Sequence, residues 1–306
     1  MGTPTFAVTA LQAIQKSKHQ VVGVVTNIDK PAGRGKKMST AAVKDYAIEQ
    51  QLPLLQPSSL KDPSFISALK ALKADVFVVV AFRMLPKMVW SIPPKGTFNL
   101  HASLLPAYRG AAPINWVIIN QEKESGVTTF LIDEKIDTGN LLLQEKMALS
   151  PGETAGSLHD KLAPLGGKLI NATLDALEKN IAARPQKTDG SEKDAPKLTK
   201  ENTRINWNQS LREIQAKIDG LSPYPAAWTE LFENDKVARL KIYRAQIELC
   251  SHNHPPLSIV VENKQMKIAH SQGYLLCQNV QMPNKRRMEV KDLLNGHQFK
   301  PTTTVK

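Results

Sequence analysis

Cysteine is scarce in this chain of 306 residues, which has only Cys250 and Cys277. Two thiols cannot form a disulfide framework or a cysteine-based zinc site, and such scarcity is typical of a reducing compartment. Long apolar runs are also missing, since no stretch approaches the ~20 residues that a membrane-spanning helix needs. The first residues lack the basic region and the apolar run of a secretory signal. These features predict a cytoplasmic protein.

Clustered metal ligands are also lacking. His252 and His254 form the only close histidine pair, and they lie in a stretch rich in Asn and Pro. Such a stretch predicts a solvated surface turn. We therefore expect no metal centre.

Acidic residues are few relative to basic ones. The chain has 28 Asp and Glu against 40 Lys and Arg, which gives a net charge of +12 and a pI near 9.6. This charge is high for an enzyme of small neutral metabolites and favours a polyanionic partner, nucleic acid first. The alternative is that the basic residues only keep the surface soluble. With 42% hydrophobic residues, the chain can bury a core.

Strand and helix patterns alternate over the first two thirds of the chain. Near-continuous apolar runs predict buried strands at 21–26, 75–81 and 97–101, and further strands are expected at 127–132 and 141–147. Helical spacing is found at 6–18, 40–51, 58–72 and 153–180. The alternation predicts a doubly wound, mostly parallel α/β sheet of Rossmann-like type. Ligands bind such sheets beyond the carboxyl ends of the strands.

The start of the sequence is unusual for this kind of sheet. Met1-Gly-Thr-Pro4 stands directly before the first predicted helix, where a central strand is normally found. The first strand of the sheet is therefore expected to be missing from this chain, unless Met1 is an internal methionine.

The composition changes near residue 185. Residues 186–203 are almost without apolar side chains and predict an exposed linker between an α/β domain, 1–185, and a second domain, 204–306. The second domain has one predicted helix and five short predicted strands, which indicate a small, OB-like β-barrel. It carries 15 Lys and Arg against 9 Asp and Glu, and is thus basic by itself. We see no stripe for self-association and predict a monomer.

Two polar residues stand out at the end of the strand at 97–101. Because side chains alternate along a strand, Asn99 and His101 point to the same face. An amide there could donate to an oxyanion, and an imidazole could move a proton. The alternative is a buried pair that only satisfies local backbone groups.

A carboxylate follows the next predicted strand. Asp137 precedes Thr-Gly in a turn and could orient His101. Asp133, which lies closer to the strand, is the competing candidate. Asp137 could instead serve only the turn.

These motifs together resemble the 10-formyltetrahydrofolate-dependent formyltransferases. The most specific block is Ser103-Leu-Leu-Pro106 followed by Arg109-Gly-Ala-Ala-Pro-Ile114, and the resemblance runs nearly end to end. Other matching segments are Gly2–Val8, Lys30–Lys37, Val78–Ala81, Asp137–Gly139 and Ser222–Pro225.

The resemblance implies a formyl transfer from 10-formyltetrahydrofolate to the amino group of initiator methionyl-tRNA, for translation initiation, without a metal. It gives Asn99 the oxyanion role, His101 the proton-transfer role and Asp137 the orienting role. It also implies that 1–185 is the formyltransferase catalytic domain and that 204–306 binds tRNA.

The resemblance further implies where the two substrates bind. The folate pocket would be formed by Val79, Leu85, Ser103, Leu104, Leu105 and Pro106. Arg83 stands where other members often have a longer, glycine-containing segment, so its role in that wall is left open. Tyr108, in the following loop, is expected to help close the site.

A basic loop is expected to contact the tRNA. Asp29–Lys37 has two glycines, one proline and four cations, so it predicts an exposed loop. The resemblance implies that this loop enters the end of the acceptor stem, with Arg34 as the strongest candidate and Lys36 and Lys37 as point charges. Lys285-Arg-Arg287 is a second candidate patch.

Two other functions are compatible with part of the sequence. The same catalytic half could serve another acceptor, such as an amino-sugar nucleotide or water, but the basic loop and the basic second domain argue against it. A non-catalytic tRNA-binding protein is the other alternative, and the joint presence of Asn99, His101 and Asp137 argues against that.

Overall fold

The computed structural model describes residues 1–32, 37–233 and 236–306. They form two compact units. Unit 1 comprises 1–113, 124–148 and 159–195, and unit 2 comprises 114–123, 149–158 and 196–306. Within the described ranges, no helix combines the length and the apolar character needed to cross a membrane.

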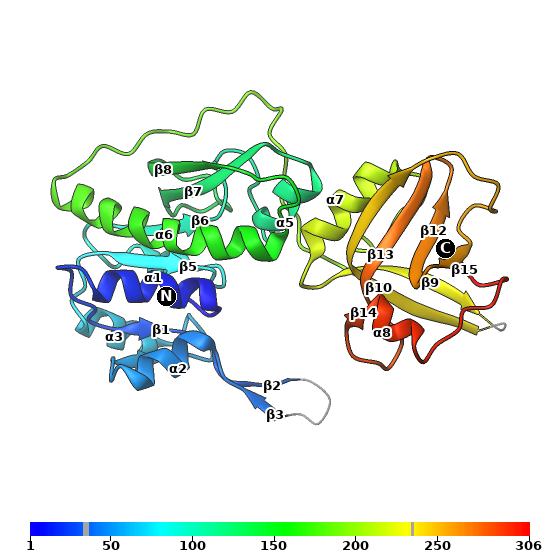
Figure 1. The fold of residues 1–306 in the computed structure, drawn as a ribbon. Helices are drawn as coiled ribbons and strands as arrows, with labels where there is room; N and C mark the ends of the chain where they lie inside the picture. Colours follow the sequence, from blue (N-terminus) through cyan, green and yellow to red (C-terminus); the bar gives the residue numbers. More distant parts are fainter. Residues whose placement is uncertain (33–36, 234–235) are drawn as a thin grey trace. The chain divides into compact units, whose positions relative to one another are not determined.

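Unit 1 contains two sheets of the predicted α/β type (Figure 1). One has the order β5 (Phe77–Val80), β6 (Thr97–His101), β7 (Glu124–Leu131) and β8 (Leu141–Ala148); the other pairs β1 (Val24–Val25) with β4 (Leu54–Leu55). The β1–β4 and β5–β6 pairs are parallel, whereas β7 and β8 run antiparallel to their neighbours. The predicted doubly wound sheet is confirmed, with an antiparallel edge.

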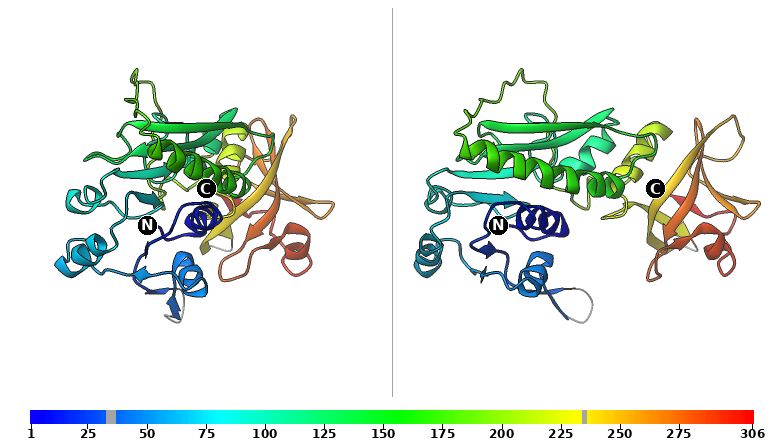
Figure 2. Two further views of the ribbon diagram at one scale, coloured as in Figure 1. Left: turned by 90° about the vertical axis from the view of Figure 1, so that its left-hand side faces the viewer. Right: turned by 60° about the vertical axis from the view of Figure 1, so that its left-hand side comes forward.

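Helices lie on both sides of β5 (Figure 2). Helix α6 (Ala155–Glu178) packs on one face, where Thr173 Oγ1 meets Thr129 Oγ1 of β7 at 2.8 Å. Helix α1 (Thr5–Gln15) lies beside it and contacts β5. On the other face, α3 (Pro63–Ala71) and α4 (Lys87–Trp90) bury an apolar cluster that includes Phe77. Asp62 caps α3 by accepting from Ser64 N.

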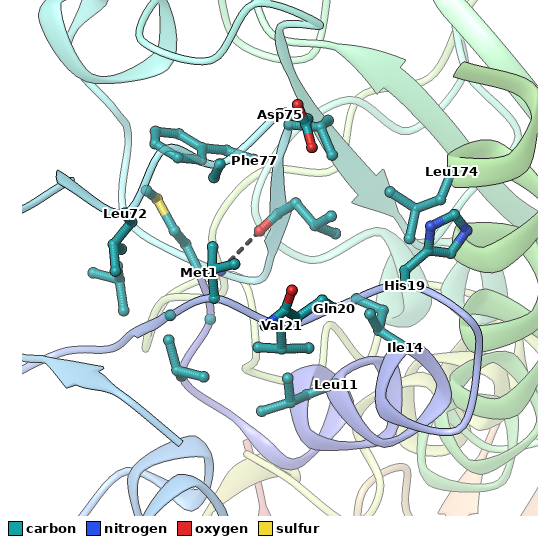
Figure 3. Close-up of a pocket in the computed structure, with 18 of the residues that line it drawn as sticks. Met1, Leu11, Ile14, His19, Gln20, Val21, Leu72, Asp75, Phe77 and Leu174 are labelled. Atoms are coloured by element: carbon teal, nitrogen blue, oxygen red, sulfur yellow. Dashed lines mark hydrogen bonds between the residues drawn. The ribbon is translucent and has the colours of Figure 1, made fainter. Parts of the chain in front are cut away.

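Met1 and Gly2 lie between β1 and β5. Gly2 N donates to Val25 O at 3.0 Å, and Val80 N donates to Met1 O at 2.9 Å. Among the described residues, Met1 and Gly2 thus occupy the position of the central strand that was expected to be missing. A cavity of about 290 Å³ lies beside them, lined mainly by apolar side chains such as Leu72 and Leu174 (Figure 3). Burial lowers the pKa of the Met1 amino group to about 5.

The basic loop is flanked by two short strands. Strands β2 (Lys30–Ala32) and β3 (Lys37–Ser39) pair antiparallel, so the segment predicted as a loop begins and ends as a hairpin. Helix α2 (Ala42–Glu49) follows. The sequence pattern did not predict these strands because glycine and proline dominate the segment.

Unit 2 is built on one antiparallel sheet. Its order is β11 (Ile259–Glu262), β12 (Gln265–His270), β13 (Gly273–Gln281), β10 (Lys236–Leu249), β9 (Ala227–Glu233) and β15 (Thr304–Val305). Strand β15 pairs with β9 and also bonds the start of β11, since Val305 N donates to Leu257 O and Ile259 N to Thr303 O. The sheet therefore curls back on itself, as the predicted small barrel requires.

The remaining elements of unit 2 pack around this sheet. Helix α7 (Leu211–Leu221) is opened by a capping box of Ser210 and Glu213, and its apolar face enters the core of the barrel. The sequence did not predict β14 (Met288–Glu289), α8 (Val290–Leu294) or β15, which are too short to show a periodicity. Helix α5 (Pro113–Ile119) belongs to unit 2 from residue 114 onward.

Candidate functional site

Strand β6 carries the two predicted polar residues at its carboxyl end. In register with β7, Asn99 faces Phe130 and His101 faces Thr128, so both side chains emerge on one face of the sheet. On the other side, Asn99 pairs with Val79 of β5. Strand β6 spans Thr97–His101, which are the bounds that the sequence predicted.

The side-chain amide of Asn99 has no hydrogen-bond partner among the described residues. Its oxygen is buried and unpaired. A buried amide without a partner is costly, by about 1–3 kcal/mol, so native structures normally satisfy it. The amide is therefore available to a bound molecule at the end of β6.

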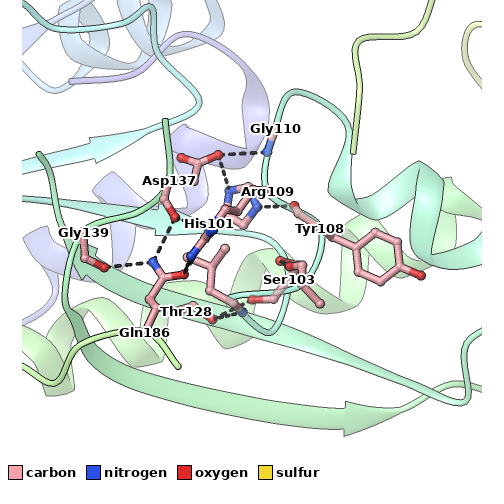
Figure 4. A network of polar contacts seen from close by, with 11 residues as sticks. His101, Ser103, Tyr108, Arg109, Gly110, Thr128, Asp137, Gly139 and Gln186 are labelled. Carbon is pink, nitrogen blue, oxygen red and sulfur yellow. Dashed lines mark hydrogen bonds and ion pairs between the residues drawn. The ribbon is translucent and has the colours of Figure 1, made fainter. Parts of the chain in front are cut away.

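His101 is buried, and its two ring nitrogens face different groups (Figure 4). Nε2 lies 2.8 Å from the carbonyl oxygen of Tyr108, which can only accept, so Nε2 carries the proton. Nδ1 lies 3.8 Å from Oδ2 of Asp137. The ring also meets Phe130 edge-on, at 6.5 Å between centroids. The lone pair of the neutral imidazole therefore lies on the side of Asp137.

Asp137 lies in a tight turn between β7 and β8. Its backbone has φ +54°, in the left-handed region that non-glycine residues rarely adopt, and its Oδ2 accepts from Gly110 N at 3.0 Å. Asp133 has different partners, because its carboxylate accepts from Lys135 N and from the hydroxyl of Thr138. The structure thus brings Asp137 beside His101, whereas Asp133 holds the turn together.

The Ser103-Leu-Leu-Pro106 loop is held by side chains of β7 and β8. Thr128 Oγ1 donates to Ser103 O at 2.6 Å and accepts from Leu105 N at 3.1 Å. Gln144 Nε2 donates to Leu105 O at 2.7 Å. Ser103 and Leu105 are buried, while Leu104 and Pro106 are partly exposed. The backbone groups of Leu105 are thus already satisfied inside the protein.

The other two residues predicted for the folate wall lie in the core of unit 1. Val79 and Leu85 are buried in the apolar cluster under α3 and α4. Arg83, between them, donates through its guanidinium to the carbonyl oxygens of Pro57 and Ser58. Its structural role is therefore to tie the segment after β5 to the loop before α3.

The predicted tRNA-binding residues are only partly described. Arg34 and Lys36 lie outside the described residues, and Lys37 is placed only as the first residue of β3. In unit 2, the Trp228 ring is surrounded by cations: Arg239 lies 4.5 Å, Arg204 5.5 Å and Lys200 5.7 Å from its centroid.

His252 is more buried than the sequence predicted, whereas His254 is exposed. His252 stacks on Tyr274 at 4.3 Å, and its Nε2 bonds the carbonyls of His270 and Gly273. The expectation of a solvated turn is therefore wrong for His252, because β13 brings Tyr274 under it. In the described ranges, no group of three or more His, Cys, Asp and Glu could hold a metal ion.

Sequence reasoning missed one side chain that contacts the site. Gln186 Nε2 donates to Asp137 O at 2.9 Å and to Gly139 O at 2.8 Å. Its polar surroundings predicted only an exposed linker, and no local pattern marks it. Tyr108 was expected near the site for its side chain, whereas its backbone carbonyl makes the contact with His101.

Comparison with known proteins agrees with the motifs. Residues 1–174 match the family described as formyl transferase, and 197–298 match the formyl transferase C-terminal domain. The methionyl-tRNA formyltransferase of Flavobacterium johnsoniae is 51% identical over 300 residues, covering 98% of this chain and 95% of that protein. The methionyl-tRNA formyltransferase of Bacteroides fragilis is 47% identical over 302 residues, covering 97% of this chain and 93% of that protein.

A solved structure shares the fold. The N-formyltransferase from Helicobacter canadensis, in complex with folinic acid and dTDP-3-aminofucose, aligns with a TM-score of 0.61 at 20% identity, covering 93% of this chain and 97% of that one. The family matches span most of the sequence and confirm the resemblance. The chain therefore belongs to the formyl transferase family.

Proposed function

We propose that Asn99, His101 and Asp137 carry out the transfer of a formyl group from 10-formyltetrahydrofolate to the α-amino group of initiator methionyl-tRNA. The activity itself follows from family membership and from relatives of about 50% identity over nearly the whole chain. The assignment of the chemistry to these three residues is supported by their convergence at the end of β6.

Asn99 would stabilise the charge that develops during the reaction. When the amine nitrogen attacks the formyl carbon, the carbonyl oxygen becomes an oxyanion, and a fixed donor in a water-poor site stabilises it by about 3–4 kcal/mol. Asn99 would donate through Nδ2 of its amide, whereas the buried atom without a partner is its oxygen, Oδ1.

His101 and Asp137 would handle the protons. The attacking ammonium must lose protons, and N10 of the folate must gain one when its bond to the formyl carbon breaks. Since Nε2 of His101 is bonded to the Tyr108 carbonyl, we assign proton exchange to Nδ1, on the side of Asp137. The Asp137 carboxylate would stabilise the imidazolium that forms.

The folate would bind against the loop at 103–106. The partly exposed side chains of Leu104 and Pro106 offer apolar surface, and Ser103, Leu105, Val79 and Leu85 are buried. Thr128 and Gln144 hold the loop in place, which favours a preformed pocket.

The tRNA would be held by two basic regions. We assign the end of the acceptor stem to Arg34, Lys36 and Lys37, and the backbone of the tRNA to residues 204–306, linked to the catalytic domain 1–185 through 186–203. The excess of cations in the second domain and the cations around Trp228 support this division. We further infer that the enzyme acts as a monomer in the cytoplasm.

One assay tests the function directly. Purified protein is mixed with 10-formyltetrahydrofolate and equal amounts of methionyl-initiator tRNA and an amino-sugar nucleotide, and formylated products are quantified. We expect formyl-methionyl-tRNA to dominate. Preferential formylation of the sugar nucleotide, or release of formate without either product, would contradict the assigned acceptor.

A further inference from the structure

The segment that leaves α6 crosses both loops of the candidate site. Arg184 pairs with Leu141 of β8 through two backbone hydrogen bonds. The segment continues through Gln186 to Ala195, which pairs with Gly110. Although most of these residues are exposed, they belong to unit 1. We call residues 184–195 the strap.

At its first contact, the strap holds the turn of Asp137. The side-chain amide of Gln186 donates to the carbonyls of both Asp137 and Gly139, and its oxygen accepts from Arg109 Nε at 3.1 Å and Nη2 at 2.5 Å. Arg109 Nε also donates to Asp137 O at 3.1 Å. The nitrogen of the Gln186 amide therefore binds the turn of Asp137, and its oxygen binds the side chain of Arg109.

The turn requires such support because its backbone is strained. Asp137 has φ +54°, and a left-handed conformation at a non-glycine residue costs on the order of 1 kcal/mol or more. Gly139 lies so close to β7 that an added Cβ would stand 1.7 Å from Leu131 O. Without hydrogen bonds from Gln186, the turn would relax toward ordinary backbone angles and move the Asp137 carboxylate.

At its second contact, the strap holds the loop that bonds His101. Tyr108 N donates to Lys193 O at 2.5 Å, and Ala195 exchanges hydrogen bonds with Arg109 and Ala111. Gly110 has φ +124°, and a Cβ there would meet Ala195 O at 2.5 Å. Tyr108, whose carbonyl binds Nε2 of His101, is thus hydrogen-bonded to the strap through its own backbone N–H.

We propose that the strap is a positioning element for the reaction, and that Gln186 is a positioning residue which sets the Asp137 carboxylate against His101. Gln186 acts through the backbone of Asp137 and touches neither substrate in this scheme. The inference rests on the proposed roles of His101 and Asp137, and it assigns a positioning role to residues of unit 1 that the sequence predicted as part of a linker.

The test compares two variants of Gln186 with a variant of the adjacent residue, Lys187. Gln186→Met keeps the length of the side chain and removes every hydrogen bond. Gln186→Glu keeps the acceptor for Arg109 but cannot donate to the two carbonyls. Lys187→Met is the matched control, because residue 187 is exposed and has no contact to the turn among the described residues. For each protein, kcat, both KM values and the thermal midpoint are measured.

We expect kcat to fall about 10- to 100-fold in both Gln186 variants, since a shift of about 1 Å in a catalytic group has an effect of this size. Both KM values should stay within about threefold, and Lys187→Met should match the wild type. Gln186→Glu is expected to fold because its pair with Arg109 survives.

Three outcomes would overturn the proposal: a kcat of Gln186→Met within threefold of wild type, wild-type kcat in Gln186→Glu, or a loss that appears equally in both KM values. Failure of the wild-type protein to formylate any tRNA would instead remove the proposed function on which the inference rests.

Discussion

Nε2 of His101 donates a hydrogen bond of 2.8 Å to the carbonyl oxygen of Tyr108, and this contact is buried. The bond fixes the tautomer of the neutral ring and leaves the lone pair on Nδ1. A backbone carbonyl thus contributes to the orientation of His101, the role that the resemblance gives to Asp137. In the proposed mechanism, the carboxylate at 3.8 Å would stabilise the charged ring.

The first prediction concerns the two residues of β6. Asn99→Ala should lower kcat by about 10²- to 10³-fold because it removes the oxyanion donor, and His101→Ala by about 10²- to 10⁴-fold because it removes the proton carrier. Single-turnover formylation of methionyl-tRNA measures both. A rate near that of the wild type in either variant would show that the chemistry is assigned to the wrong side chain.

The second prediction separates the two aspartates of the turn. Asp137→Asn should lower kcat about 10²-fold or more, because a neutral amide cannot stabilise the imidazolium of His101. Asp133→Asn is the matched control. It weakens the bonds to Lys135 N and Thr138, so it should lower the thermal midpoint while leaving most of kcat. The reverse pattern would favour Asp133 as the partner of His101.

The fold could be predicted well where periodicity is strong. Strand β6 matched its predicted bounds, and the single helix predicted for the second domain is present as α7. The antiparallel direction of β7 and β8 could not be predicted, because the apolar pattern of a buried strand does not depend on the direction in which the strand runs. Neither could β15, whose two residues depend on partners more than 40 positions away.

The candidate site was predictable only in its side chains of distinctive chemistry. Asn99, His101 and Asp137 stand in a specific motif, whereas Gln186 lies in a polar stretch and acquires its partners through the fold. The contact between His101 and Tyr108 involves a backbone carbonyl, which no residue type encodes. The sequence also could not show that Val79 and Leu85 pack into an apolar core cluster under α3 and α4.

The third prediction tests the basic loop. Arg34→Ala should raise KM for methionyl-tRNA, because the substitution removes a phosphate or base contact. KM for 10-formyltetrahydrofolate should stay unchanged, because the folate pocket is not altered. Loss of one phosphate contact should also reduce the slope of log affinity against log salt by about 0.7–0.9. Titrations of tRNA binding between low and moderate salt measure this slope. Equal losses for both substrates would contradict the division of labour.

The fourth prediction concerns the two cysteines. Cys250 is exposed, whereas Cys277 is buried in the barrel, and burial raises the pKa of its thiol to about 12. Since the thiolate is the reactive form, a disulfide reagent at pH 8 should titrate one thiol in the native protein and two after denaturation. Cys250→Ser should abolish the native reaction. Rapid reaction of two thiols in the folded protein would show that the barrel opens to solvent.

The last prediction concerns the pH dependence of stability. Burial in α7 raises the pKa of Asp219 to about 6, against a smaller opposing effect of Arg244. Because the folded pKa lies above the ordinary value of 3.8, the folded state favours the protonated acid. The resulting stability is fully present below pH 4 and is lost as pH rises through 6. Asp219→Asn, which stays neutral, should therefore stabilise the protein at pH 8 by about 1 kcal/mol, after allowance for partial exposure. Thermal unfolding at pH 5 and pH 8 measures the difference, with exposed Asp292→Asn as the control. An equal gain at both pH values would mean that ionisation of Asp219 does not oppose folding.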